Sequence, residues 1–202
     1  MQALFIHGMG RSPLSGWPLV RRLRAKGVHS SSFAYIAAVQ DFAQISTRLA
    51  ARIEALAHRD DYVLIGHSLG GVLLRSAMAA LSPGTRPPSR VFLLGSPVQP
   101  SRLAVFFQRN PLYRLITDDC GQLLASEDRM NGIPALSVPT TAILGEHPIS
   151  LTARLFVGEA NDGIVSESET RADWIGEKIS VPVMHSFLAG NPRVAELILA
   201  RV

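Results

Sequence analysis

The sequence has little of what disulfide-stabilised, metal-thiolate or membrane-spanning proteins require. Its 202 residues include a single cysteine, Cys120, which excludes an internal disulfide and a metal cluster held by several thiolates. Asp118 and Asp119 precede this residue, and their negative charge disfavours a reactive thiolate, so a structural or merely exposed thiol is expected. No apolar run approaches the ~20 residues that a transmembrane helix needs.

Lysine is also scarce, and neither basic nor acidic residues form long runs in the sequence. The chain carries 20 basic and 16 acidic residues, and 18 of the basic residues are arginine. They form no block of five or six, so a nucleic-acid groove is disfavoured and solvated helix faces account for most of them. A content of 47% hydrophobic and 18% charged residues excludes a disordered chain.

The length suits one domain over residues 1–202, able to bury about 70% of its unfolded surface. The amino terminus lacks a charged segment followed by an apolar one, and a strand is predicted to start by Ala3. We therefore expect a cytoplasmic protein without a signal peptide or a transmembrane segment.

Short apolar runs alternate with longer helical patterns, which is typical of parallel βαβ units. Strands are predicted at 3–7, 31–39, 62–65, 91–94, 140–144 and 181–184, with a further one at 154–157. Helices are predicted at 16–26, 42–56 and 69–81, and after Asn191-Pro192. The alternation predicts an α/β fold with a mostly parallel central sheet and helices on both faces.

Residues 98–139 interrupt this alternation. The segment is rich in apolar and turn residues, and we expect a small lid-like insert in which Phe106, Phe107, Leu112 and Tyr113 line a cleft for an acyl chain. The alternative is a set of peripheral helices packed on the sheet.

The chemistry is indicated first by Gly66-His67-Ser68-Leu69-Gly70, which matches the pattern G-x-S-x-G. The motif follows a predicted strand and precedes a predicted helix, the setting in which a sharp turn exposes the serine hydroxyl. Side chains at Gly66 and Gly70 would collide across that turn. Ser68 is thus a candidate nucleophile, and the Leu69 N–H at the helix start is a candidate oxyanion donor.

A serine needs a base to accept its proton, and His185 is the best placed of six histidines. It follows the last predicted strand, in a loop before the closing helix. His67 is adjacent to Ser68, but on a sharp turn it points elsewhere, so a packing role is expected for it.

The base in turn needs a carboxylate to orient it. Asp162 lies in the turn Asn161-Asp162-Gly163 and completes the chain order serine, acid, histidine. Glu146, which follows a strand and Gly145, and Glu159 are the alternatives.

A second oxyanion donor is expected from His7-Gly8-Met9-Gly10, in the loop after the first strand. The Met9 N–H is the candidate donor, and His7 is expected to brace the loop. A phosphate-binding loop is disfavoured, because Pro13 stands where the third glycine of G-x-G-x-x-G is required.

These motifs in this order resemble the α/β-hydrolase superfamily, and within it the small serine lipases and esterases. Leu94-Gly95-Ser96-Pro97 and the helix after His185 also match. The resemblance covers nearly the whole chain and implies a compact α/β-hydrolase fold, with Ser68, His185 and Asp162 as catalytic triad and the Met9 and Leu69 amides as oxyanion hole. The chain departs from larger members by starting directly at the strand before His7-Gly8, and by a long segment, 147–160, ahead of the acid.

The resulting hypothesis is a serine hydrolase that cleaves carboxylic esters of a small molecule or lipid, without a cofactor or metal. A thioesterase, amidase or acyltransferase would use the same triad. A non-catalytic binding protein on this scaffold would be expected to have lost a triad member, and all three have candidates here.

Overall fold

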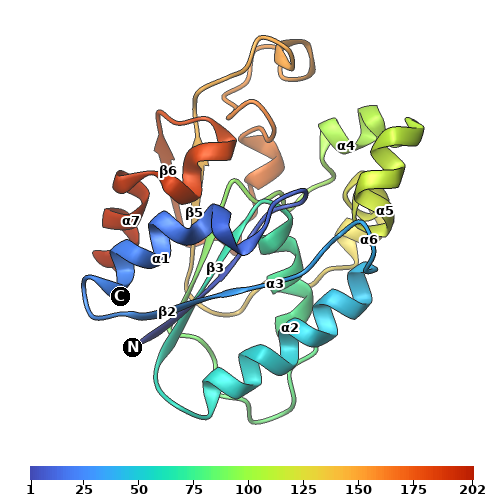
Figure 1. The fold of residues 1–202 in the computed structure, drawn as a ribbon. Coiled ribbons are helices and arrows are strands. Elements are labelled where there is room, and N and C mark those ends of the chain that lie inside the picture. The colour runs from blue at the N-terminus through green and yellow to red at the C-terminus, as the bar shows by residue number, and fades with distance from the viewer.

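The computed structural model describes residues 1–202, and its six strands form one fully parallel sheet (Figure 1). The strands are β1 (Gln2–Ile6), β2 (His29–Phe33), β3 (Tyr62–His67), β4 (Arg90–Leu94), β5 (Thr140–Gly145) and β6 (Glu177–Val181). Their order across the sheet is β2-β1-β3-β4-β5-β6. The chain order reverses between β1 and β3, and the crevice at the carboxyl ends of two such strands is where ligands bind in open parallel sheets.

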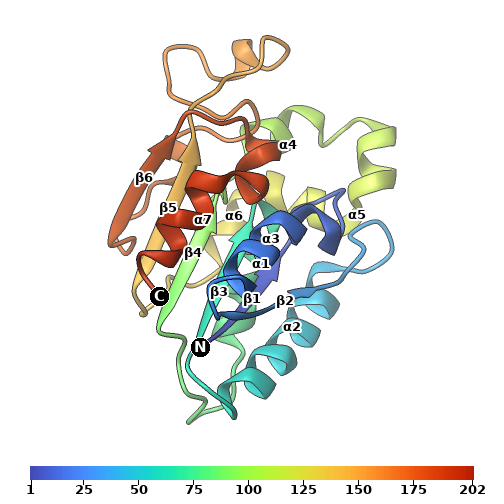
Figure 2. The ribbon, with the colours of Figure 1, turned by 60° about the vertical axis from the view of Figure 1, so that its left-hand side comes forward.

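Helices cover both faces of this sheet (Figures 1 and 2). They are α1 (Trp17–Arg24), α2 (Phe42–Ala57), α3 (Leu69–Ala79), α4 (Arg102–Phe107), α5 (Pro111–Ala125), α6 (Glu127–Asn131) and α7 (Pro192–Leu199). The cores show that α1 and α7 pack on one face, and α2 and α3 on the other. None of these helices is both long and apolar enough to pass through a bilayer. The α/β fold expected from the sequence is confirmed, and the sheet is parallel throughout.

The central strands are buried on both faces, which explains their continuous apolar sequences. In β1, Leu4 and Ile6 join the core under α2 and α3, while Ala3 and Phe5 join the core under α1 and α7. Each large side chain fully buried in this way contributes roughly 1.5–3 kcal/mol. The two cores therefore fix the sheet and so the positions of the loops that leave its carboxyl edge.

Residues 98–139 form α4, α5 and α6, which sit at the carboxyl end of the sheet (Figure 1). The second half of α5 joins the core through Leu123, and α6 joins it through Met130. Cys120 is also buried there, and burial together with the negative charge of Asp119 raises the pKa of its thiol to about 12, in keeping with the expected structural role. The first half of α5 instead exposes Leu112 and Leu115, so this segment is part core and part surface.

Two predicted strands are shorter or absent. The strand predicted at 31–39 is β2, His29–Phe33, and it ends where its partner β1 ends, at the pair Ile6 and Phe33. The strand predicted at 154–157 is wrong, because Ala153–Leu155 form a 3-10 turn. The segment pairs with no strand, and the two neighbours of β5 in the sheet are β4 and β6.

The last predicted strand, 181–184, is displaced in the sequence. The strand is β6, Glu177–Val181, an edge strand in which only Val181 is buried. Pro182 has no N–H to donate to a ladder, so the strand ends before it. No apolar run marks β6 in the sequence, because one side of an edge strand faces water and its residues there are polar.

We predict that Leu73→Ala lowers the free energy of unfolding by about 2–5 kcal/mol, because it leaves a cavity in the core between α3 and the sheet. Leu73 is fully buried, whereas Leu112 is 66% exposed. The same truncation at Leu112 is expected to change stability by less than about 0.5 kcal/mol. Urea denaturation followed by circular dichroism measures both, and equal losses would contradict this description of the insert.

Candidate active site

Ser68 occupies a sharp turn between β3 and α3. Its φ of 53° and ψ of −126° lie in a region that a residue with a side chain rarely adopts, at a cost of order 1–3 kcal/mol. The Ser68 N–H donates to the carbonyl oxygen of Leu94 over 2.9 Å, which ties the turn to the end of β4. The hydroxyl-bearing residue is half-buried at the carboxyl edge of the sheet.

Two glycines of the motif are required by close contacts, as the sequence predicted. A β-carbon on Gly70 would collide with the carbonyl oxygens of Ile6 and His7, and one on Gly66 with the backbone of Gly71. The turn thus packs directly against the end of β1.

His185 and Asp162 form a buried pair. The His185 Nδ1–H donates to Asp162 Oδ2 over 2.7 Å, and the two side chains are 7% and 0% exposed. The other oxygen, Asp162 Oδ1, accepts from the N–H groups of Ile164 and Val165 at 3.0 and 2.8 Å. The turn therefore fixes the carboxylate, and the carboxylate fixes the tautomer in which His185 Nε2 can accept a proton.

The competing acids lie elsewhere. Glu146 is exposed, and Glu159 pairs with Arg102 at 2.8 Å and accepts from the Ser168 N–H. Of the three candidates, Asp162 is the one in contact with an imidazole.

Gly95 brings Ser68 and this pair together. It follows Leu94, which accepts the Ser68 N–H, and a β-carbon on it would lie 2.8 Å from Asp162 Oδ2 and 2.9 Å from His185 Nδ1. The Ser68 hydroxyl makes no hydrogen bond with His185 in this structure, and such bonds often form only once substrate is bound. The sequence offered one signal for Gly95, a glycine directly after a buried strand.

The two expected oxyanion donors are unused by the protein. The N–H groups of Met9 and Leu69 donate to no other protein atom. Gly8 lies against the turn, since a β-carbon on it would be 3.0 Å from the Ser68 β-carbon. The Leu69 N–H, next to Ser68, and the Met9 N–H, next to Gly8, are thus both free, as donors to a developing oxyanion must be.

His7 braces this loop. Its Nδ1–H donates to the Gly8 carbonyl oxygen over 2.9 Å. Its ring stacks on Tyr35 with centroids 4.2 Å apart, and the Tyr35 hydroxyl donates to the His7 carbonyl oxygen over 2.7 Å. Burial lowers the pKa of His7, so the ring is held neutral, as a bracing role requires.

His67 supports His185 in a way that no pattern in the sequence indicates. Its Nε2–H donates to the His185 carbonyl oxygen over 3.1 Å, and the two rings lie 4.8 Å apart. Burial, with a smaller effect of the neighbouring His185, lowers the pKa of His67 to about 3. A second unforeseen contact joins Arg11 Nη2 to Ser186 Oγ over 2.6 Å, which links the Met9 loop to the His185 loop.

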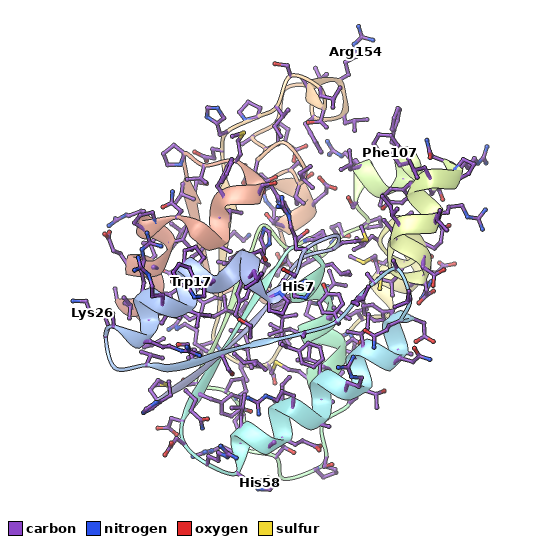
Figure 3. All side chains as sticks on the ribbon, viewed as in Figure 1. His7, Trp17, Lys26, His58, Phe107 and Arg154 are labelled. Carbon is purple, nitrogen blue, oxygen red and sulfur yellow. The ribbon has the colours of Figure 1, made fainter.

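The four residues expected to line an acyl cleft cluster on α4 and α5. Phe107 packs against Phe106 edge to face at 4.8 Å and stacks on Tyr113 at 6.0 Å. Phe106 and Leu112 are about two-thirds exposed. Figure 3 shows Phe107 and Arg154 at the end of the molecule opposite His58. The cluster forms an apolar surface at the active-site end.

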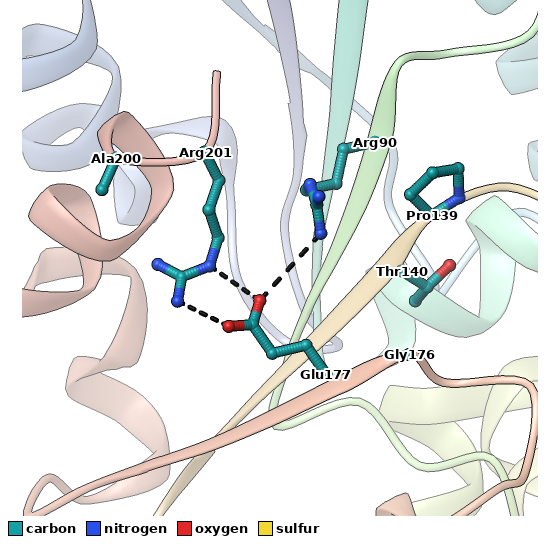
Figure 4. Close-up of a pocket in the computed structure, with 7 residues that line it drawn as sticks. All are labelled: Arg90, Pro139, Thr140, Gly176, Glu177, Ala200 and Arg201. Atoms are coloured by element: carbon teal, nitrogen blue, oxygen red, sulfur yellow. Dashed lines mark hydrogen bonds and ion pairs between the residues drawn. The ribbon is translucent and has the colours of Figure 1, made fainter.

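A cavity of about 690 Å³ lies at the other end of the sheet (Figure 4). Its walls include Arg90 and Arg201, both directed at Glu177, which Arg201 contacts at 2.6 Å. Because these residues start β4 and β6 or follow α7, the cavity is remote from Ser68. It is not the site that the triad candidates define.

The fold is that of the α/β-hydrolase class, and a comparison of sequences shows the family. The sequence profile of the alpha/beta hydrolase family matches residues 3–174. The chain belongs to that family. A search of curated proteins gives no significant match.

Several solved structures share the fold. The mature lipase BlEst2 of Bacillus licheniformis is 18% identical over 100% of this chain and 91% of its own, with a TM-score of 0.73. The metagenomic carboxyl esterase MGS0156 is 16% identical over 100% and 74%, with a TM-score of 0.77. The RedJ thioesterase of Streptomyces coelicolor is 16% identical over 100% and 85%, with a TM-score of 0.70.

We predict that His67→Gln weakens the loss of stability on acidification. A histidine with a folded pKa of about 3 and an unfolded pKa of about 6.5 takes up a proton only on unfolding between these values, so stability falls as pH falls through this window. The contribution approaches about 1.4 kcal/mol per pH unit well below 6.5. Urea denaturation at pH 7, 6 and 5 measures it.

His58→Gln is the matched control, because His58 is exposed. Identical pH dependence of the wild type and His67→Gln would show that His67 is not held neutral in the folded state.

Proposed function

We propose that this hydrolase cleaves carboxylic esters with Ser68 as nucleophile, His185 as general base and Asp162 as the acid that orients His185. The observation that carries the proposal is the buried 2.7 Å contact of His185 Nδ1 with Asp162 Oδ2, next to a serine in a strained turn. A buried carboxylate that orients an imidazole is the arrangement that converts a nearby serine into a nucleophile.

The reaction has two halves. His185 Nε2 accepts the Ser68 proton as Oγ attacks the ester carbonyl, and the Met9 and Leu69 amides stabilise the tetrahedral oxyanion. The protonated His185 then gives its proton to the leaving alcohol, and an acyl-enzyme remains on Ser68. Water, activated by the same imidazole, releases the acid and restores the serine.

The surface around the site suits an apolar acyl group. Fourteen large hydrophobic side chains are exposed, and all but the terminal Met1 and Val202 belong to segments that follow the carboxyl end of a strand. They are Leu14, Trp17, Ile36, Val39, Val105, Phe106, Leu112, Leu115, Ile116, Leu151, Val157 and Phe187. Of these, Val105, Phe106, Leu112, Leu115 and Ile116 lie on α4 and α5, and an exposed apolar patch of this kind marks a binding surface. We assign Phe106, Phe107, Leu112 and Tyr113 to the acyl side of the substrate.

Thioester cleavage is the second candidate, because the same acyl-enzyme forms whether the leaving group is an alcohol or a thiol. The fold of RedJ, a thioesterase, matches all of this chain. A common fold leaves the leaving group open, and kcat/KM for p-nitrophenyl butyrate compared with that for S-butyryl-N-acetylcysteamine distinguishes ester from thioester.

Labelling by a fluorophosphonate tests the nucleophile. The wild type is expected to be labelled under native conditions, and Ser68→Ala is expected to lose both labelling and at least about 10⁴-fold in kcat for p-nitrophenyl butyrate. Circular dichroism of the variant checks that the fold is retained. Equal labelling of both proteins would exclude Ser68 as the nucleophile.

A pair of isosteric substitutions tests the acid. Asp162→Asn is expected to lower kcat by about 10⁴-fold, because an amide stabilises the wrong tautomer of His185 and cannot stabilise the imidazolium. Glu146→Gln, at an exposed position, is the control and is expected to change kcat by less than about threefold. A large loss in the second variant alone would assign the role to Glu146.

A further inference from the structure

We propose that a cleft beside the oxyanion loop binds a phosphate group carried by the substrate, which makes the preferred substrate a phosphate-bearing acyl ester or thioester. The cleft has a volume of about 570 Å³ and lies between the loops that follow β1 and β2. Arg11 and Arg48 contribute its charge, and Tyr35, Ile36 and Val39 its apolar walls. The assignment rests on the proposed function, because it names the substrate of the same site.

The two guanidinium groups have donors to spare. Arg11 uses Nη2 for Ser186 Oγ, and Arg48 uses Nη2 for the Ala34 carbonyl oxygen at 3.3 Å. Neither is paired with a carboxylate, whereas Arg90 and Arg201 of the remote cavity share Glu177. Each guanidinium has five N–H donors in a planar fork that matches the oxygens of a phosphate.

The surrounding sequence keeps this cleft positive. Residues 1–40 contain five arginine or lysine residues and no aspartate or glutamate. The next carboxylate along the chain, Asp41, accepts from the Gln44 N–H at the start of α2, so it serves as a helix cap. No carboxylate lines the cleft, whose charged residues are Arg11 and Arg48, so an anion that enters it meets two cations.

The cleft is joined to the active site through two of its wall residues. Tyr35 stacks on His7, two residues before the Met9 amide, and Arg11 holds Ser186, the neighbour of His185. We therefore assign a phosphate bound by Arg11 and Arg48 to the same molecule whose carbonyl Ser68 attacks. The exposed side chains of Ile36 and Val39 can cover the apolar part of the group that carries the phosphate.

Two arginines select a phosphate group, which can come from two sources. One is a phospholipid head group, and the other is a thiol that carries phosphate groups elsewhere in the molecule, as coenzyme A does. Two matched pairs of substrates distinguish them. Butyryl-coenzyme A is compared with the neutral S-butyryl-N-acetylcysteamine, and dihexanoyl phosphatidate with dihexanoylglycerol, below the concentration at which these lipids aggregate.

The measured quantity is the ratio of kcat/KM for the phosphate-bearing member to that for its neutral partner. This ratio cancels any general loss of catalysis. We expect a ratio of at least about 10 at low ionic strength in one pair, falling as salt is added. Arg11→Gln and Arg48→Gln are each expected to lower the ratio about fivefold or more.

Arg59→Gln is the matched control. Arg59 is exposed and unpaired just beyond the far end of α2, so the variant has the same net charge as Arg48→Gln but an unaltered cleft. An unchanged ratio in this variant supports a local site, and an equal fall in all three variants would reduce the effect to net charge and overturn the proposal. Ratios near one in both pairs would also overturn it, and the esterase assignment would still stand.

A binding measurement without turnover tests the phosphate cleft separately from the proposed ester cleavage. Inorganic pyrophosphate is titrated into Ser68→Ala and into Ser68→Ala combined with Arg11→Gln and Arg48→Gln, with calorimetry as the readout. Binding by the first protein and loss of at least about tenfold in affinity in the second support the cleft even if no ester is cleaved. Equal affinities, or no binding by either protein, would overturn the cleft and leave catalysis untouched.

Discussion

At the end of β3 the backbone reverses at one residue, Ser68, and the rest of the site depends on how that strained turn is held. The Leu94 carbonyl oxygen fixes its N–H, and Gly70 lets it pack onto the end of β1. This close packing brings Gly8 against the serine, and the Leu69 N–H is free because Leu69 is the first residue of α3. The strain is sustained by two buried cores, which together contribute far more than the turn costs.

The parallel order of the sheet explains why residues so distant in sequence meet. Met9 follows β1, Ser68 follows β3, Gly95 follows β4, Asp162 lies after β5 and His185 after β6. Every one of these segments leaves the sheet at the same edge, and the reversal of strand order between β1 and β3 opens a crevice there. The fold therefore supplies the geometry, and the chemistry depends only on which side chains the loops carry.

The sequence predicted the parts of the molecule whose constraints are local. Continuous apolar runs identified the strands that are buried on both faces. The glycines around Ser68 identified the turn, because a side chain at Gly66 would collide with the backbone of Gly71, only a few residues away. The limits of β2 and β6 depend on a neighbouring strand or on solvent at an edge, and no local pattern encodes them. The same is true of the contacts of His67 with His185 and of Arg11 with Ser186, which join loops from opposite ends of the chain.

The polar character of the two edge strands has a consequence for association between molecules. β2 reads His29-Ser30-Ser31-Ser32-Phe33, and β6 starts with Glu177 and Lys178. An open edge presents unpaired N–H and C=O groups to which a strand of another molecule can add, and short strands with charged or polar side chains resist such addition. The polar residues of these edges, which in β6 also obscured the strand in the sequence, thus protect a six-stranded open sheet against edge-to-edge aggregation.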